Sequence, residues 1–77
     1  MLEVLYGRNA VCEALRAGRR HFESVVVAEG LQERGAVARI LALATEQNVR
    51  IDHIRRRQLD RLGAVNHQGI AAQVDSY

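Results

Sequence analysis

Three segments of the chain place apolar residues along one side of an α-helix. The first covers residues 8–17 and is followed by Gly18, a residue type that commonly lies just past a helix end. The second covers residues 33–47 and has the clearest stripe, with apolar residues three and four positions apart. A shorter third helix is predicted over residues 55–62.

Four further segments have the composition of β-strands. Residues 4–6 and 70–74 are short apolar runs, and residues 49–54 alternate apolar and polar positions as a half-buried strand does. Residues 24–28 are apolar at both alternations and contain three consecutive valines. A strand of this kind is covered on both of its faces, usually by helices.

The resulting order is strand, helix, strand, helix, strand, helix, strand. This alternation predicts the α/β class, with a sheet layered by helices. We expect residues 1–77 to form a single domain, in which a chain of this length buries only about 60% of its unfolded surface. A linker to a further domain is expected to begin near residues 75–77.

Composition narrows the class of protein. Hydrophobic residues make up 48% of the chain and charged residues 26%, as in ordinary globular domains. No apolar run approaches the roughly 18 residues of a membrane span, and the first residues do not have the pattern of a secretory signal. The single Cys12 cannot form an internal disulfide, which fits a reducing compartment. We therefore expect no membrane partner and a cytoplasmic location.

The basic residues suit a phosphate-bearing partner, although the absence of lysine is also what codon bias in a GC-rich genome produces. All eleven of them are arginine, and nine acidic residues leave a net charge of +2. Arginine binds phosphate with two nitrogens at once and stacks on bases. The two clusters are made of Arg16, Arg19 and Arg20, and of Arg55, Arg56, Arg57 and Arg61. If both lie on one surface, they form the positive face of a nucleic-acid-binding protein; the alternative is solvated charge on separate helix ends.

The residues expected of a catalytic centre are not found. A structural zinc site needs about four Cys or His ligands at close spacing, and this chain has one Cys and three widely separated His residues. Cys12 falls in the middle of a helix beside its apolar face, which is typical of a structural thiol. The sequence has no glycine-rich phosphate loop and no suitably placed pair of carboxylates. We therefore predict no catalytic residue, metal site or cofactor site in these 77 residues.

The segment Gly7-Arg8-Asn9 connects the first strand to the first helix. Asn9 is predicted to be the N-cap of that helix, with its side chain accepting hydrogen bonds from first-turn amides. Arg8 then lies at a helix N-terminus, where the dipole favours anions, and is a candidate phosphate ligand. The alternative is that Asn9 is only a cap and Arg8 only a solvated charge.

The segment "NHQGIAA", residues 66–72, joins polar side chains to the last strand. His67 and Gln68 offer hydrogen-bond donors and acceptors suited to base edges or ribose hydroxyls. Gly69 permits a backbone conformation or a close approach that a Cβ atom would prevent. The alternative is a buried His67 whose ring nitrogens bond to nearby backbone groups, and the residues alone do not decide between the two.

Two motifs in the chain resemble a known family. "YGRNAVCEAL" at residues 6–15 and "NHQGIAA" at residues 66–72 resemble the N-terminal substrate-binding domain of SpoU-type (TrmH-family) RNA 2′-O-ribose methyltransferases. The nearest resemblance is to the subgroup that modifies a guanosine in 23S ribosomal RNA. The likeness extends over nearly all 77 residues, and the order and separation of the two motifs make it more specific than either motif alone.

The resemblance implies a small three-layer α/β/α sandwich with a mixed four-stranded sheet, similar to RNA-binding ribosomal proteins. It implies that structured ribosomal RNA binds at the matched positions Arg8, Asn9, His67, Gln68 and Gly69, although the place of Asn9 is often filled by histidine in the family. A separate C-terminal catalytic domain would bind S-adenosylmethionine and form a homodimer. This chain would hold no cofactor of its own and be a monomer.

The arginine clusters add three residues to the candidate RNA-binding set, namely Arg19, Arg20 and Arg56. A second hypothesis is that the chain is a protein-interaction module that docks on its own catalytic domain or on another protein. A small stand-alone enzyme is disfavoured, because no pair of titratable groups is placed for acid–base chemistry.

Overall fold

The structure is a computed structural model of the chain, and it describes residues 2–18, 20–61 and 68–75. Strands and helices alternate along it in the predicted order. In chain order the elements are β1 (Leu2–Tyr6), α1 (Arg8–Ala17), β2 (Phe22–Ala28), α2 (Ala36–Glu46), β3 (Arg50–Ile54), α3 (Arg56–Asp60) and β4 (Ile70–Asp75).

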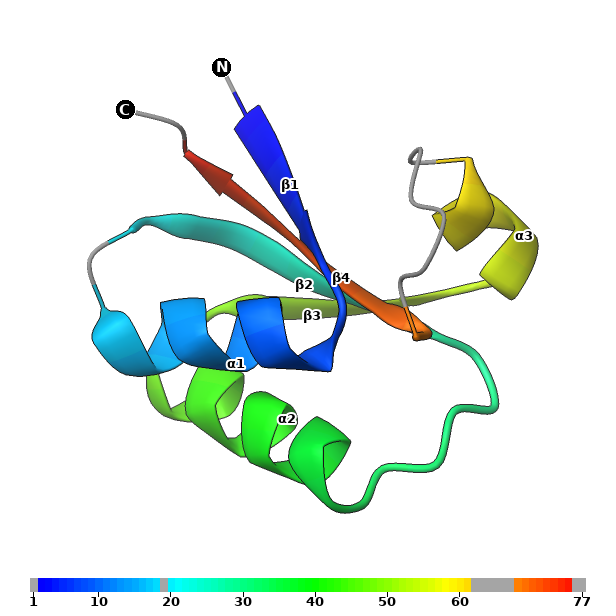
Figure 1. Cartoon of the computed structure of the whole chain (residues 1–77), viewed down its shortest axis with the longest axis horizontal. Coiled ribbons are helices and arrows are strands. Elements are labelled where there is room, and N and C mark those ends of the chain that lie inside the picture. Colours follow the sequence, from blue (N-terminus) through cyan, green and yellow to red (C-terminus); the bar gives the residue numbers. More distant parts are fainter. Residues whose placement is uncertain (1, 19, 62–67, 76–77) are drawn as a thin grey trace.

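The strands form one mixed sheet in the order β1-β4-β2-β3 (Figure 1). β4 lies between β1 and β2 and is antiparallel to both, whereas β2 and β3 are parallel and are connected through α2. The last strand of the chain is therefore an inner strand. Because β4 pairs directly with β1, the turn that precedes β4 lies close to the turn that follows β1.

The main hydrophobic core lies between the sheet and the helices α1 and α2, which pack side by side on one face (Figure 1). Val11 and Leu15 of α1 are fully buried there, together with Ile40 and Ala44 of α2. The strand residues that complete this core are Phe22, Val25, Val27, Ile70, Ala72 and Val74. Cys12 is partly buried against the same cluster, which confirms the interpretation of its thiol as structural.

The short helix α3 covers part of the opposite face of the sheet (Figure 1). Its Leu59 is fully buried, in a cluster that includes Val26 and Ala71. The three consecutive valines therefore alternate between the two cores, because Val25 and Val27 belong to the main core and Val26 to the smaller one. Helices on both faces confirm the predicted α/β/α layering, although the third layer is only five residues long.

The predicted start of the second helix, at residue 33, is wrong. The helix begins at Ala36, and residues 31–34 have no regular structure. Gly35 directly precedes the helix with a φ of 63°, a left-handed conformation that an α-helix does not contain. The apolar stripe itself begins at Val37, inside the helix, so periodicity did not fix where the helix starts.

Other boundaries also differ from the prediction, among them the start of β1, which lies at Leu2 and not at residue 4. β2 begins at Phe22, two residues earlier than expected, and a bulge between Phe22 and Ser24 shifts its register with β4. The helix expected over residues 55–62 ends at Asp60. The predicted end of that helix at Leu62 and Gly63 lies outside the described residues.

Candidate nucleic-acid interface

Arg8 is the first residue of α1 and is exposed at the turn from β1 into that helix. The turn consists of Gly7 alone, which is buried and has a φ of 90°. The backbone N–H of Gly7 donates to the carbonyl oxygen of Ile70 at 3.1 Å. This bond fixes the start of α1 against the start of β4, so that Arg8 stands beside the turn that leads into the last strand.

Gln68, from that second turn, satisfies the first amide of α1. The backbone N–H of Arg8 donates to Oε1 of Gln68 at 3.1 Å, although the two residues are 60 positions apart in the chain. The first amides of a helix have no partner inside it, so this side chain replaces a local cap. Gln68 holds its position with a φ of 56°, which is unusual for a residue other than glycine.

The prediction that Asn9 is the N-cap is wrong. Asn9 is the second residue of α1 and is exposed, and the N-cap position is occupied by Gly7, which has no side chain to offer. Because one glycine makes the whole turn, the chain is already helical at Arg8 and no residue with a capping side chain precedes the first turn. Asn9 remains a candidate contact because it is exposed next to Arg8.

Gly69 lies in the turn before β4, next to Gln68, and is buried, with a φ of 80°. Its carbonyl oxygen accepts a hydrogen bond from the backbone N–H of Ala28 at 2.9 Å. An ideal Cβ atom on Gly69 would lie 3.1 Å from Cδ1 of Leu31 and 3.6 Å from Nη1 of Arg56. The guanidinium group of Arg56 therefore approaches Gly69 from α3.

Four of the predicted RNA-binding residues thus meet at one end of the sheet, around the start of β4. We call this group the β4-start surface and define it as Arg8, Arg56, Gln68 and Gly69. It combines guanidinium groups from two different helices with a turn held in a fixed conformation by hydrogen bonds at both of its sides. His67 lies outside the described residues, and its role stays a prediction.

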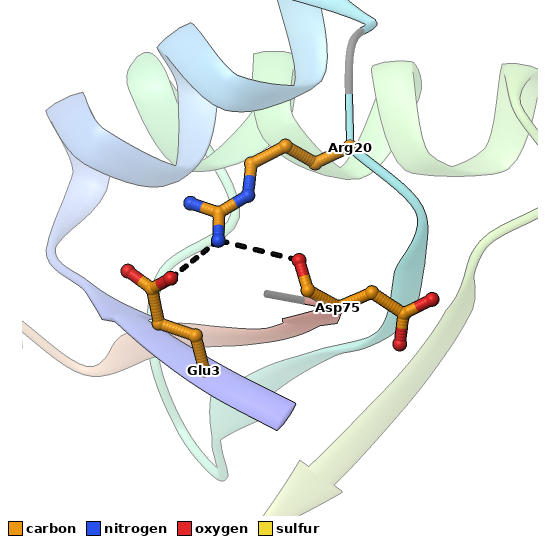
Figure 2. A network of polar contacts seen from close by, with 3 residues as sticks. All are labelled: Glu3, Arg20 and Asp75. Carbon is orange, nitrogen blue, oxygen red and sulfur yellow. Dashed lines mark hydrogen bonds and ion pairs between the residues drawn. The ribbon is translucent and has the colours of Figure 1, made fainter. Parts of the chain in front are cut away.

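Arg20 lies at the opposite end of the sheet, where β1 begins and β4 ends. Figure 2 shows its two contacts there. Its Nη2 atom forms an ion pair with Oε1 of Glu3 and donates to the backbone carbonyl oxygen of Asp75 at 3.2 Å. The side chain is only 22% exposed. It thereby joins the segment after α1 to the beginning of β1 and the end of β4.

Arg20 of the first cluster and Arg56 of the second therefore lie at opposite ends of the sheet and do not share a surface. α1 starts beside the start of β4 and ends near the end of β4, so its ten residues, about 15 Å of helix, separate the two clusters. Arg20 is an internal ionic contact and does not belong to the β4-start surface. Arg19 lies outside the described residues.

Neither a metal site nor a membrane span is indicated in the part of the chain that the structure describes. No group of three or more His, Cys, Asp or Glu side chains in residues 2–18, 20–61 and 68–75 is placed to hold a metal ion. None of the helices in these ranges has the length and apolar character needed to cross a membrane.

Comparison with known proteins identifies the family. The sequence profile described as RNA 2′-O ribose methyltransferase substrate binding matches residues 4–77. The chain belongs to this family. It is a SpoU-type substrate-binding domain, as the two motifs predicted.

Relatives of the domain are longer proteins. The domain is 32% identical over 75 residues to a protein of Bacillus subtilis (strain 168) named as a TrmH family tRNA/rRNA methyltransferase, YacO, and the match covers 97% of the domain and 29% of that protein. It is 37% and 38% identical over 76 residues to proteins of Mycolicibacterium gilvum and Mycobacterium tuberculosis named as uncharacterized tRNA/rRNA methyltransferases. The domain spans about a quarter of the length of these relatives.

Two residues near the interface were not predicted from the sequence. Leu31 is partly buried against the main core and approaches Gly69 from an irregular segment, a contact that no local pattern indicates. Oε1 of Gln58 accepts a hydrogen bond from the backbone N–H of Arg55 at 3.1 Å and so satisfies the start of α3. A glutamine three residues after the residue that precedes a helix is a known capping pattern, so this contact had a sequence signal.

Substitutions of Gln68 are expected to show whether its side chain caps α1. Gln68→Ala removes the acceptor for the Arg8 amide and should lower the free energy of unfolding by about 1 kcal/mol. Gln68→Glu keeps an acceptor and adds a negative charge at the helix N-terminus, so it should be as stable as the original domain or more stable. Urea denaturation of both variants measures the difference, and equal stabilities would show that the Gln68 side chain does not cap α1.

Proposed function

We propose that the domain recognises structured ribosomal RNA for a ribose 2′-O-methyltransferase, through the β4-start surface. The observation that carries this proposal is the hydrogen bond from Arg8 to Gln68, which brings two segments 60 residues apart into one rigid arrangement. Arg56 extends that arrangement from α3. Membership of the substrate-binding family supports RNA as the ligand.

The chemistry of the surface suits folded RNA. RNA is recognised largely through its shape, its 2′-hydroxyl groups and its unstacked bases, for which arginine and amide groups are appropriate partners. Arg8 and Arg56 offer planar forks that can bind phosphate groups or stack on bases. Oε1 of Gln68 accepts the hydrogen bond from the first amide of α1, and its side-chain amide nitrogen carries two N–H donors for a ligand. The rigid turn lowers the entropy lost when a ligand binds.

We further propose how the domain works within a longer protein. The relatives are named as tRNA/rRNA methyltransferases, and the domain would present a 23S ribosomal RNA guanosine to a separate catalytic domain that binds S-adenosylmethionine. On this proposal the isolated domain is monomeric, the complete enzyme is a homodimer formed by its catalytic domain, and the enzyme acts in the cytoplasm.

Removal of the Arg8 guanidinium group is expected to weaken RNA binding without unfolding the domain. Arg8→Gln should lower the affinity for a labelled ribosomal RNA hairpin about 3- to 10-fold at low salt and make the dependence of log K on log salt shallower by about one. Because Arg8 is exposed, the thermal midpoint of the Arg8→Gln variant should stay close to that of the original domain. Fluorescence anisotropy over a series of salt concentrations measures both binding quantities.

Arg16→Gln is the matched control for this experiment. Arg16 is an exposed arginine in the last turn of the same helix, at the end away from the β4-start surface. The two variants have the same net charge, so a general loss of positive charge would affect them equally. Equal affinities of the two variants would contradict the proposed interface. A hairpin that does not bind the domain even at low salt would instead favour a protein-interaction module.

A further inference from the structure

Most of α3 is not needed for packing. Leu59 is the buried residue of this five-residue helix, and the others, together with Arg55 and Arg61 on either side, are exposed. The arginines around Leu59 therefore do not contribute to the smaller core through burial.

The positions of these arginines are unfavourable for the helix by itself. Arg55 and Arg56 stand at its N-terminal end, where the helix dipole disfavours positive charge, whereas Arg57 already belongs to its last turn. Arg57 and Arg61 are four residues apart, so like charges are neighbours along one side of the helix. A bound anion would relieve both kinds of repulsion.

The arginines of this segment point to two different places. Arg56 approaches Gly69 in the β4-start surface, whereas the other three surround a hollow of about 530 Å³ that is also lined by Gln58. No carboxylate lines this hollow among the described residues. Among the described residues, Arg20 pairs with Glu3, Arg50 with Asp52 and His53 with Glu33, and these ion pairs use none of the arginines at the hollow.

We propose that this hollow is a phosphate site that holds one backbone phosphate group of the bound RNA. We call it the α3 hollow and define it by Arg55, Arg57, Gln58 and Arg61. Guanidinium groups bind phosphate oxygens through paired N–H donors, and the side-chain amide of Gln58 carries N–H donors as well. The hollow has room for a phosphate group with several water molecules, each of which occupies about 30 Å³.

The location of the hollow supports RNA as the source of that phosphate. α3 is only five residues long, about 7.5 Å, so the hollow lies within one or two helical turns of the Arg56 contact with Gly69. A strand bound at the β4-start surface would therefore bring its next phosphate groups into reach. This inference rests on the proposed function and adds a separate anchoring point to it.

The test is a double variant, Arg57→Gln with Arg61→Gln. We expect its affinity for a labelled ribosomal RNA hairpin to fall about 3- to 10-fold at low salt, and the slope of log K against log salt to become shallower by about one. Arg57→Lys keeps the charge but loses the paired donors, so it should weaken binding by at least about two-fold. Titration with inorganic phosphate should shift the Nε–Hε NMR signals of Arg57 and Arg61 in the original domain.

Arg39→Gln combined with Arg34→Gln is the control of equal charge. Arg34 lies in the segment before α2 and Arg39 in α2, and both are exposed. A double variant of the α3 hollow that binds RNA no more weakly than this control would overturn the phosphate site. If Arg8→Gln still weakens binding in that case, the proposed function stands without the site. If RNA binding is unchanged in all the variants, the proposed function fails as well.

Thermal melting of the double variant separates the loss of an RNA contact from the loss of the folded state. Because the two substitutions remove a like-charge pair on an exposed helix, the double variant should melt at or above the temperature of the original domain. A variant that loses RNA affinity only together with its cooperative melting transition would count against a direct phosphate contact. Binding of poly-glutamate at the α3 hollow, with no change in RNA affinity on mutation, would show an acidic protein surface as the ligand and would also overturn the proposal.

Discussion

Replacement of Leu59 by alanine is expected to lower the free energy of unfolding by about 2–4 kcal/mol. Leu59 is fully buried and is the side chain through which α3 enters the smaller core. Its removal leaves a cavity against Val26 and Ala71, both of which are held in the sheet and cannot move far to fill it. A domain of this length has a total stability of only about 4–12 kcal/mol, so the loss is a large share.

The same substitution is expected to weaken RNA binding, because Leu59 positions both Arg56 and the α3 hollow. Leu43→Ala is the matched control, since Leu43 is partly buried at the edge of the main core and should cost about 1 kcal/mol. Urea denaturation gives the stabilities, and anisotropy at a temperature where both variants are folded gives the affinities. A Leu59→Ala domain that binds the hairpin as tightly as Leu43→Ala would show that α3 takes no part in binding.

Replacement of Gly69 by alanine is expected to cost about 2–3 kcal/mol of unfolding free energy. A φ of 80° is strained for any residue with a Cβ atom, at about 1–2 kcal/mol. The new methyl group would also lie 3.1 and 3.2 Å from the two Cδ atoms of Leu31, closer than ordinary contact. Leu31 packs against the main core, so its displacement disturbs contacts beyond the turn.

Gly30→Ala isolates the steric part of this effect. Gly30 has a nearly identical φ of 83°, but a Cβ atom on it would have no neighbour within 4 Å. The strain that follows from φ is therefore similar in both variants, and the excess cost at Gly69 is expected to come from the contact with Leu31. Thermal or urea unfolding of the pair is the measurement. Equal losses would mean that Leu31 moves aside freely and that Gly69 is required only for its conformation.

Gly69→Ala should also reduce RNA affinity more than Gly30→Ala does. Gly69 follows Gln68 directly, and both have positive φ values, so a shift at Gly69 moves the side chain that holds the Arg8 amide. Arg56 lies on the other side of the same position. One small group added at this turn would therefore disturb three components of the β4-start surface together.

Local features of the fold were predicted accurately from the sequence. α1 covers the predicted residues 8–17, and Gly18 ends it with a φ of 64° and a backbone hydrogen bond to Ala14. The three consecutive valines predicted a strand covered on both faces, and they are divided between two cores as expected. These features depend on residues that are only a few positions apart, and their spacing can be read from the sequence.

Other features depend on backbone conformation that periodicity does not reveal. Gly35, with its positive φ, directly precedes α2 and sets its start at Ala36, three residues after the predicted start. The one-residue turn at Gly7 took the N-cap position of α1 and left Asn9 without the predicted capping role. In both cases a single glycine decided an element boundary, because its range of allowed φ values is wider than that of the residues around it.

The sequence by itself determined the alternation of strands and helices, the two-sided burial of β2 and the identity of the motifs that belong to the family. Only the tertiary structure decided which charged groups share a surface. The strand order β1-β4-β2-β3 placed Gln68 on the first amide of α1 and Arg56 beside Gly69, and it left Arg20 at the far end of β4 in contact with Glu3. The physical reason is the separation of the residues along the chain. Periodicity reports the environment of each element, whereas contacts between residues 60 positions apart depend on how the elements pair.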